Sequence, residues 1–354
     1  MKASRQNGRQ KTPKAGTKSL HRSVGLSLIL VLLTGLAVAG FLSRDTSKTP
    51  ASVQKTSTAK SPRTLAELLE LKPAELEGTD IALMNLLCAE GLPGAENLKV
   101  EDCLATLDKW ATHTKREIDR NYHHFRKDPA YYYHSEAFYK MLMLAVVVYE
   151  DFGVRYNPKL IAPPSEMRGD DHFFADSRDI LIHGMASPRR MGTCSSMPIL
   201  YIALGQRLGY PLKLVKARGH LFMRWDSPTE KFNMDATGKG LDKHDDDYYR
   251  RWPFPLTDVD IKEDDYLKSL SAAEELSVFL SIRGACQTDN GQFGDALASF
   301  NLAHQLVPTW KGNQVLLAGA RQRLARPVTL VQQQGMANIP ADPNPLNRIQ
   351  TKSP

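Results

Sequence analysis

A cysteine, a histidine and an aspartate, in that order along the 354-residue chain, are the residues whose types could do chemistry: Cys194, His220 and Asp235. Cys194 lies in a turn directly before an apolar helix predicted over 197–208, and the positive end of a helix lowers the pKa of a thiol. A nearby histidine can hold such a thiol as a thiolate–imidazolium pair, and a carboxylate can orient the imidazole. The trio therefore predicts a nucleophile, a base and an orienting acid.

Two strands predicted over 211–217 and 220–225, followed by a third, must position the histidine and the aspartate. If Ser227 and Pro228 form a tight turn, residues 226 and 229 pair and His220 lies directly opposite Asp235. Facing residues on antiparallel strands have Cβ atoms about 4.5–5.5 Å apart, which suits this role. Asn233 shares the same face and is the alternative orienting residue. A bulge in either strand would change this register.

The other candidate ligands and thiols have simpler explanations. Cys286 fits a buried apolar position. Cys88 and Cys103 could form a disulfide, which the exported location predicted below permits, or they could be two separate buried thiols. Arg189 and Arg190 would add to the field at the nucleophile if they point inward. No histidine or acidic cluster has a zinc spacing, and no phosphate loop or dinucleotide fingerprint occurs, so we expect neither a metal nor a cofactor.

The N-terminus has the pattern of a membrane anchor. Residues 1–63 carry a charge of +11 and the rest of the chain −4, so the basic total of +7 comes from the tail and does not indicate a nucleic-acid partner. Residues 24–42 contain no charge, and a helix of that length rises about 28 Å, close to the thickness of a bilayer core. We expect a single-pass membrane protein with a cytoplasmic N-terminus and an extracytoplasmic C-terminal part. Cleavage near Ala39, which would release a secreted protein, is the alternative.

The C-terminal part has a repeat-like pattern at helix-turn-helix spacing, formed by Gly284, Ala296, Phe300, Ala303 and Pro308. This spacing resembles one tetratricopeptide repeat, and a further helix is expected over 312–325. Both a helical cap on the main domain and a peptide-binding groove would explain it.

Three segments around the candidate residues carry a family resemblance: GTCSSMPILYIALGQRLGYPLKLV, GHLFMRWD and FNMDAT. They resemble the core of the transglutaminase-like superfamily, in particular a bacterial branch with a helical leader, a Cys-His-Asp core and C-terminal tetratricopeptide-like helices. The leader segments DIALMNLLCAEGLPG and CLATLDKWA fit as well. The resemblance implies an α+β fold with a papain-like core, in which Cys194 is the nucleophile, His220 the base and Asp235 the orienting acid.

The predicted organisation combines this resemblance with the pattern of the whole chain. Its parts are a basic cytoplasmic tail (1–23), a transmembrane anchor (24–42), a flexible stalk (43–63), a helical leader domain (64–155), the core (156–270), tetratricopeptide-like helices (271–326) and a disordered tail (327–354).

The resemblance implies acyl transfer on an amide bond, either hydrolysis or transfer to an amine. The expected substrate is a protein or peptide, with a cell-wall amide as a second candidate. The alternative function is a non-catalytic, membrane-anchored scaffold that binds a protein partner through residues 276–326.

Overall fold

The computed structural model describes residues 61–161, 172–237 and 242–325. The predicted tail, anchor and most of the stalk lie outside these residues, as does the predicted C-terminal tail. Among the helices of the described ranges, none is long and apolar enough to cross a membrane. The predicted domain boundaries stay predictions.

The N-terminal part of the described chain is helical because its apolar residues recur at helical spacing and its helices begin at capping residues. Asp80 caps the third helix by accepting from the backbone N–H of Ala82. The longest helix carries acidic residues in its first turn and basic residues in its last turn, which suits its dipole. The helices are α1 (Leu65–Leu69), α2 (Pro73–Leu76), α3 (Ile81–Leu87), α4 (Val100–Lys127) and α5 (Glu136–Val146), with a 3-10 turn at Pro129–Tyr132 and a π-helical turn at Val147–Asp151.

Helix α8 (Met197–Arg207) runs through the middle of the molecule and is buried from Met197 to Gly205. It packs against α3 and α4 on one side and against the sheet on the other. Gly209 follows with φ +76°, a left-handed conformation that turns the chain into the sheet at little cost for glycine. Because the helix is packed on all of these elements, it fixes the position of the turn before its N-terminus, which carries Cys194, relative to the strands.

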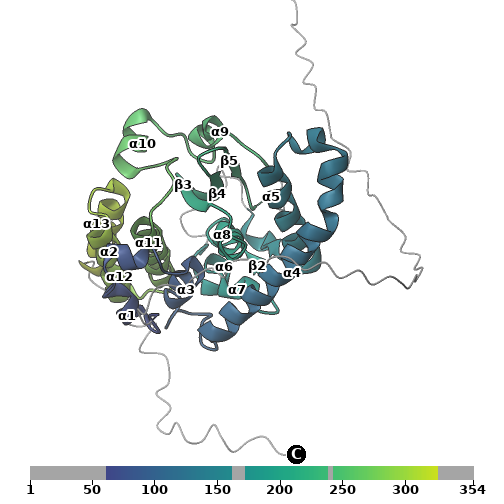
Figure 1. Ribbon diagram of the computed structural model, residues 1–354. Coiled ribbons are helices and arrows are strands. Elements are labelled where there is room, and N and C mark those ends of the chain that lie inside the picture. The colour runs from purple at the N-terminus through teal and green to yellow at the C-terminus, as the bar shows by residue number, and fades with distance from the viewer. Residues whose placement is uncertain (1–60, 162–171, 238–241, 326–354) are drawn as a thin grey trace, which may run out of the picture. The chain divides into compact units, whose positions relative to one another are not determined.

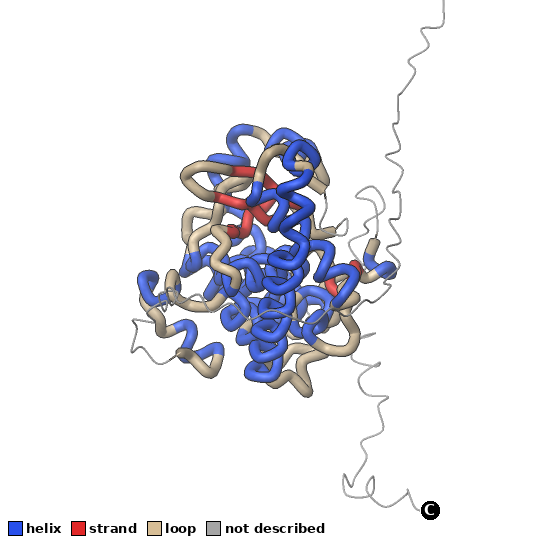
Figure 2. The backbone as a smooth tube through the Cα atoms, turned by 45° about the vertical axis from the view of Figure 1, so that its right-hand side comes forward, coloured by secondary structure: helices blue, strands red, loops and turns tan. Residues whose placement is uncertain are grey.

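The sheet is antiparallel and has the order β3 (Leu212–Ala217), β4 (His220–Asp226) and β5 (Lys231–Met234). Figure 2 shows these short strands gathered in one region and surrounded by helices. The predicted register between β4 and β5 is wrong. Asp226 pairs with Lys231, so the hairpin loop has four residues, whereas the predicted turn has two. The Ser227 side chain fills this loop by bonding the backbone of Glu230.

A second sheet consists of two short strands. Strand β1 (Arg155–Tyr156) pairs in parallel with β2 (Met191–Gly192), so Tyr156 stands beside Gly192 and close to Cys194. Three short elements lie between the two strands along the chain: a 3-10 turn at Pro158–Leu160 and the helices α6 (Ser177–Ile180) and α7 (His183–Ala186).

The chain beyond β5 is helical, with α9 (Asp246–Arg251), α10 (Asp258–Asp264), α11 (Ala272–Asp289), α12 (Phe293–Leu306) and α13 (Lys311–Ala325). Helices α11 and α12 form an antiparallel hairpin, and α13 packs on α12. A Cβ atom at Gly284 would come 2.6 Å from the ring of Phe300, so this glycine permits the close approach of the two helices. The hairpin and its third helix have the expected positions, while their identity as a tetratricopeptide repeat stays a prediction.

Candidate functional site

Cys194 stands in the turn between β2 and α8. Ser196 and Met197 both donate their backbone N–H groups to the carbonyl of Thr193, which closes this turn over the cysteine. The side chain of Ser196 accepts from the N–H of Thr193 and donates to the carbonyl of Asp179, so the turn is tied to α6. The cysteine is half-buried between two buried neighbours, which leaves its thiol fixed in direction but open on one side.

His220 and Asp235 are brought together although their predicted register is wrong. The imidazole Nε2 and the carboxylate Oδ2 lie 2.7 Å apart, and both side chains are buried. Continued along the strands, the observed register places Thr237 opposite His220, and Asp235 lies two residues before Thr237. His220 and Asp235 are therefore diagonal neighbours on one face of the sheet. A shift of two residues preserves the face, because side chains alternate along a strand.

Asp235 is held by three further hydrogen bonds. Its Oδ2 accepts from the Tyr249 hydroxyl at 3.2 Å, and its Oδ1 accepts from the backbone N–H and the hydroxyl of Thr237 at 2.8 and 2.5 Å. Trp252 contacts the imidazole edge-on, with ring centroids 4.7 Å apart. The aspartate thus has little freedom to turn away from the histidine.

The surroundings of His220 favour the imidazolium. Burial lowers the pKa of His220, but the hydrogen bonds and negative charges of Asp235 and Cys194 outweigh burial and raise this pKa to about 9. Burial also raises the pKa of Asp235, yet the hydrogen bonds from His220 and Thr237 lower it overall, so the carboxylate stays charged. Because Asp235 occupies Nε2, the nitrogen left for the Cys194 thiol is Nδ1.

Asn233, the alternative orienting residue, does not contact His220 in the described hydrogen-bond network. Its Oδ1 accepts from Arg224 Nε at 2.7 Å, and its Nδ2 donates to Asp246 at 2.8 Å. The two upstream arginines are also engaged elsewhere. Arg189 pairs with Asp176 and Asp179, and Arg190 lies over the ring of Trp110.

The remaining three cysteines are free thiols in different surroundings. Cys88 and Cys103 are not bonded to each other, so the alternative of two separate thiols describes them. Burial raises the pKa of Cys88 to about 12, of Cys103 to about 11 and of Cys286 to about 12. These thiols stay protonated at neutral pH, and His220 is hydrogen-bonded to Cys194 alone among the four.

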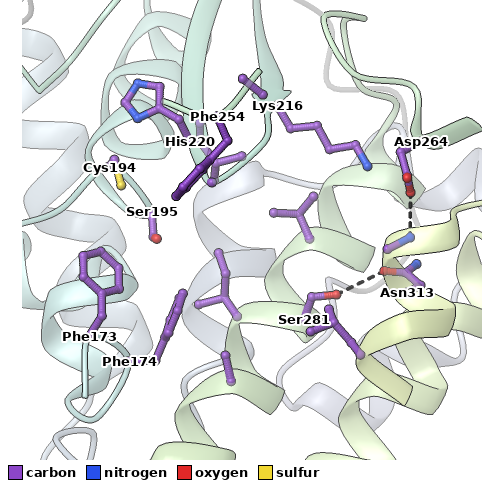
Figure 3. Close-up of a pocket in the computed structure, with 18 of the residues that line it drawn as sticks. Phe173, Phe174, Cys194, Ser195, Lys216, His220, Phe254, Asp264, Ser281 and Asn313 are labelled. Atoms are coloured by element: carbon purple, nitrogen blue, oxygen red, sulfur yellow. Dashed lines mark hydrogen bonds between the residues drawn. The ribbon is translucent and has the colours of Figure 1, made fainter. Parts of the chain in front are cut away.

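A cavity of about 830 Å³ opens beside Cys194 and His220. Figure 3 shows the sulfur and the imidazole at one end and Lys216, Asp264 and Asn313 at the other. Helices α11 and α13 supply much of the far wall through Val278, Ile282 and Leu316. The C-terminal helices therefore line the same cavity as the Cys194 thiol.

The comparison with protein families gives a match. Residues 101–274 match the transglutaminase-like superfamily. No curated protein and no solved structure matches the chain. The matched span holds Cys194, His220 and Asp235, along with α4 to the start of α11. Members of this superfamily are generally cysteine-dependent enzymes.

Two residues of the transglutaminase-like domain were missed by sequence reasoning. Tyr156 stands at Cys194: burial raises the pKa of the Tyr156 hydroxyl well above its usual range, and the neighbouring Cys194 adds to this effect. Burial and the charge of Asp235 also raise the pKa of the Tyr249 hydroxyl well above its usual range. Both hydroxyls are therefore neutral donors at pH 7. A sequence signal that could have pointed to Tyr249 is the aromatic run at 248–253, whereas nothing in the sequence near Tyr156 marks that residue.

Proposed function

We propose that the protein is a thiol enzyme that transfers acyl groups from amide bonds, with Cys194 as nucleophile, His220 as acid and base, and Asp235 as the residue that orients His220. The observation that carries this proposal is the buried His220–Asp235 pair, which has its second imidazole nitrogen left for the half-buried Cys194 at the mouth of a large cavity. The family match supports the same reaction class.

In the first half of the reaction the Cys194 thiolate attacks the amide carbonyl and forms a C–S bond. His220 gives its proton to the departing nitrogen, the C–N bond breaks, and an acyl thioester and a free amine result. Asp235 stabilises the imidazolium before this transfer and fixes the ring so that Nδ1 faces the sulfur. The carboxylate is suited to this because hydrogen bonds hold both of its oxygens.

The oxyanion that forms during the attack needs hydrogen-bond donors close to the sulfur. The hydroxyl of Tyr156 lies there, where it also accepts from the backbone N–H of Cys194. One well-placed donor of this kind contributes about 3 kcal/mol to the transition state.

In the second half, water or an amine attacks the thioester while His220 takes up its proton, and the thiolate is regenerated. Water gives a carboxylic acid and an amine gives a new amide. A protein, a peptide or a cell-wall amide fits this scheme as the first substrate.

A direct test uses the purified full-length chain, an active ester and two cysteine variants. We expect 4-nitrophenyl acetate to acetylate Cys194, with a burst of 4-nitrophenol and the acetyl group located by peptide mass spectrometry. Cys194→Ala should lose the burst, whereas Cys103→Ala, which removes a half-buried thiol that does not line the cavity, should retain it. Adding hydroxylamine should then yield acetohydroxamate if amines are acceptors. Equal nitrophenol release by the wild type and Cys194→Ala would refute the proposal and favour the non-catalytic scaffold.

The membrane anchor belongs to the same proposal. Residues 24–42 would tether the enzyme with its N-terminus in the cytoplasm and its transglutaminase-like domain outside. A binding role of residues 276–326 for a protein partner is a second, separate prediction. Protease protection of the tail and domain in intact cells would test the topology.

A further inference from the structure

The cavity beside Cys194 has two polar ends and an apolar middle. The thiol and the imidazole form one end, and Lys216 on β3 lies at the other (Figure 3). Between them the wall is aliphatic and aromatic, with Phe174 and Phe254 from two loops and Val278, Ile282 and Ala285 from α11. A ligand that fills this space buries apolar surface along most of its length.

Several polar groups of the far wall are already engaged within the protein. Ser281 donates to the carbonyl of Ser277, and its Oγ lies 3.3 Å from the Asn313 side chain. Asn313 donates its amide hydrogens to Ser277 and to Ala303. Asp289 accepts from the N–H of Phe174. A peptide bound in this part of the cavity would bring one amide group per residue. These amides would find few hydrogen-bond partners in the wall, and burying them unpaired costs free energy. A hydrocarbon segment has no such cost.

Lys216 differs from these wall groups. Its ammonium lies 3.1 Å from the ring centroid of Trp310 and 4.9 Å from that of Tyr266. Within the described ranges of the chain it has no hydrogen-bond acceptor and no carboxylate within 4.0 Å. An ammonium carries three donors, so these donors are available to a ligand in the cavity.

The acidic residues near Lys216 have partners of their own. Asp264 accepts from the backbone N–H of Gly312 at 2.8 Å, and Asp265 accepts from the indole N–H of Trp310 at 3.1 Å. Glu274 pairs with Lys268 at 3.0 Å, and Lys268 also lies 3.6 Å from Asp265. Burial lowers the pKa of Lys216 to about 8, although Asp264, Asp265 and Glu274 act in the opposite direction. A negative group on a ligand would complete the hydrogen bonding of this lysine and favour its charged form.

We propose that the cavity binds an acyl group with an apolar segment next to the reacting carbonyl and a carboxylate at its far end, which pairs with Lys216. This inference rests on the proposed function, since it assigns the acyl part of the substrate that Cys194 attacks. It also gives α11 and α13 a role as the wall that selects the substrate.

The test compares active esters that differ only at the far end of the chain. The probes are the mono-4-nitrophenyl esters of adipic, suberic, sebacic and dodecanedioic acid, each paired with the probe whose far carboxyl is a methyl ester. We expect kcat/KM to favour the free carboxylate over the methyl ester by about ten- to a hundredfold at pH 7, as for a hydrogen bond to a charged group. The preference should depend on chain length and be largest for the chain that spans the cavity.

Lys216→Met keeps most of the apolar stem and removes the charge. In this variant the ratio between the two probes should fall toward one, and Lys216→Arg should restore part of it. Lys231→Met is the matched control, because Lys231 lies in the same sheet, pairs with Asp226 at 3.4 Å and does not line the cavity. Thermal unfolding of each variant checks that the fold is retained. The preference of the wild type should also decline as the pH rises above about 8, since the lysine then loses its proton.

The outcomes separate this inference from the proposed function. Acylation of Cys194 with equal rates for both members of every pair would overturn the carboxylate site and leave the thiol chemistry standing, and a preference for apolar peptides over all of these esters would do the same. If no ester acylates Cys194, the proposed function fails, and calorimetric titration of Cys194→Ala with sebacic acid monoamide tests the site by itself. Binding that disappears in Cys194→Ala with Lys216→Met would support the site, and absence of binding would overturn it.

Discussion

One face of strand β4 carries two buried polar clusters, and they differ in how completely they are satisfied. His220 bonds Asp235 through one nitrogen, while its other nitrogen remains for Cys194 at the cavity. Two pleats away, Arg224 bonds Asn233, Asp246 and the carbonyl of Leu267 at 2.7, 2.5 and 3.0 Å. Phe222 separates them and stacks on Tyr249 at 3.7 Å.

The two clusters differ in whether a polar atom is left over for a group outside the cluster. All three guanidinium nitrogens of Arg224 donate hydrogen bonds to groups of the protein. These bonds join β4, β5, α9 and the segment before α11. The His220 cluster contains a group whose second hydrogen-bonding atom faces a thiol and a cavity. Burial alone is equal in both, since His220 is 5% and Arg224 2% exposed.

The substitution His220→Ala should give the largest difference between the two clusters, measured as the reactivity of the Cys194 thiol. The Cys194 thiol would lose the imidazolium that stabilises its thiolate, and a free thiol with a pKa of about 8.5 is ionised only to a small extent at pH 6. We expect the rate of Cys194 alkylation by iodoacetamide at pH 6 to fall roughly a hundredfold, measured by mass spectrometry of the labelled peptide. A rate that does not change, or a similar loss in Arg224→Met, would contradict the distinction.

The same variant has a consequence for the pH dependence of stability. The pKa of His220 is raised in the folded state, to about 9, so the pair contributes its full stability below about pH 6.5 and loses it as the pH rises through 9. The difference in free energy of unfolding between the wild type and His220→Ala should therefore shrink over this range. Urea unfolding at pH 6, 7.5 and 9 would measure it.

Arg224→Met should have the next largest effect, and on stability. The variant leaves Asn233 Oδ1 and the Leu267 carbonyl without their donor inside the protein, while Asp246 is half-exposed and loses little. We expect the free energy of unfolding to fall by about 2–3 kcal/mol, with the rate of Cys194 alkylation unchanged in the folded protein. Arg224→Lys, which keeps the charge but loses the forked geometry, should recover only part of the loss. Slow alkylation in folded Arg224→Met would show that the two clusters are coupled.

Tyr249→Phe should have the smallest effect, since it removes one of four hydrogen bonds to Asp235 and leaves the stack on Phe222 in place. We expect a loss of about 1 kcal/mol in stability. The carboxylate would become less stabilised, so the pKa of His220 should rise slightly, which NMR of the imidazole would detect. A fall in this pKa would mean that the Tyr249 hydroxyl does not stabilise the charged aspartate.

The sequence was sufficient to select Cys194, His220 and Asp235, because a cysteine before a helix and two polar residues on neighbouring strands are local patterns. The register was wrong because the loop after Asp226 has four residues, and loop geometry depends on side-chain bonds such as those of Ser227. The error moved the pairing by two residues, so both side chains stayed on the same face. Whether these residues carry the catalytic roles stays a prediction.

Other parts of the site depend on contacts between distant segments. Tyr156 reaches Cys194 only because β1 and β2 pair in parallel, and a two-residue strand has no periodicity to detect. Lys216 looks like an ordinary strand lysine in sequence. Its position over Trp310 requires the start of α13 to fold back onto β3.

The cavity wall determines when the cavity is complete during synthesis of the chain. Cys194 and His220 emerge from the ribosome well before α11 and α13, which supply Val278, Ile282 and Leu316. A chain still being translated would therefore hold Cys194 and His220 with this wall of the cavity missing. If the proposed function holds, selection of the acyl group would begin only once α13 has docked on α12, so the C-terminal helices would decide when the protein starts to act.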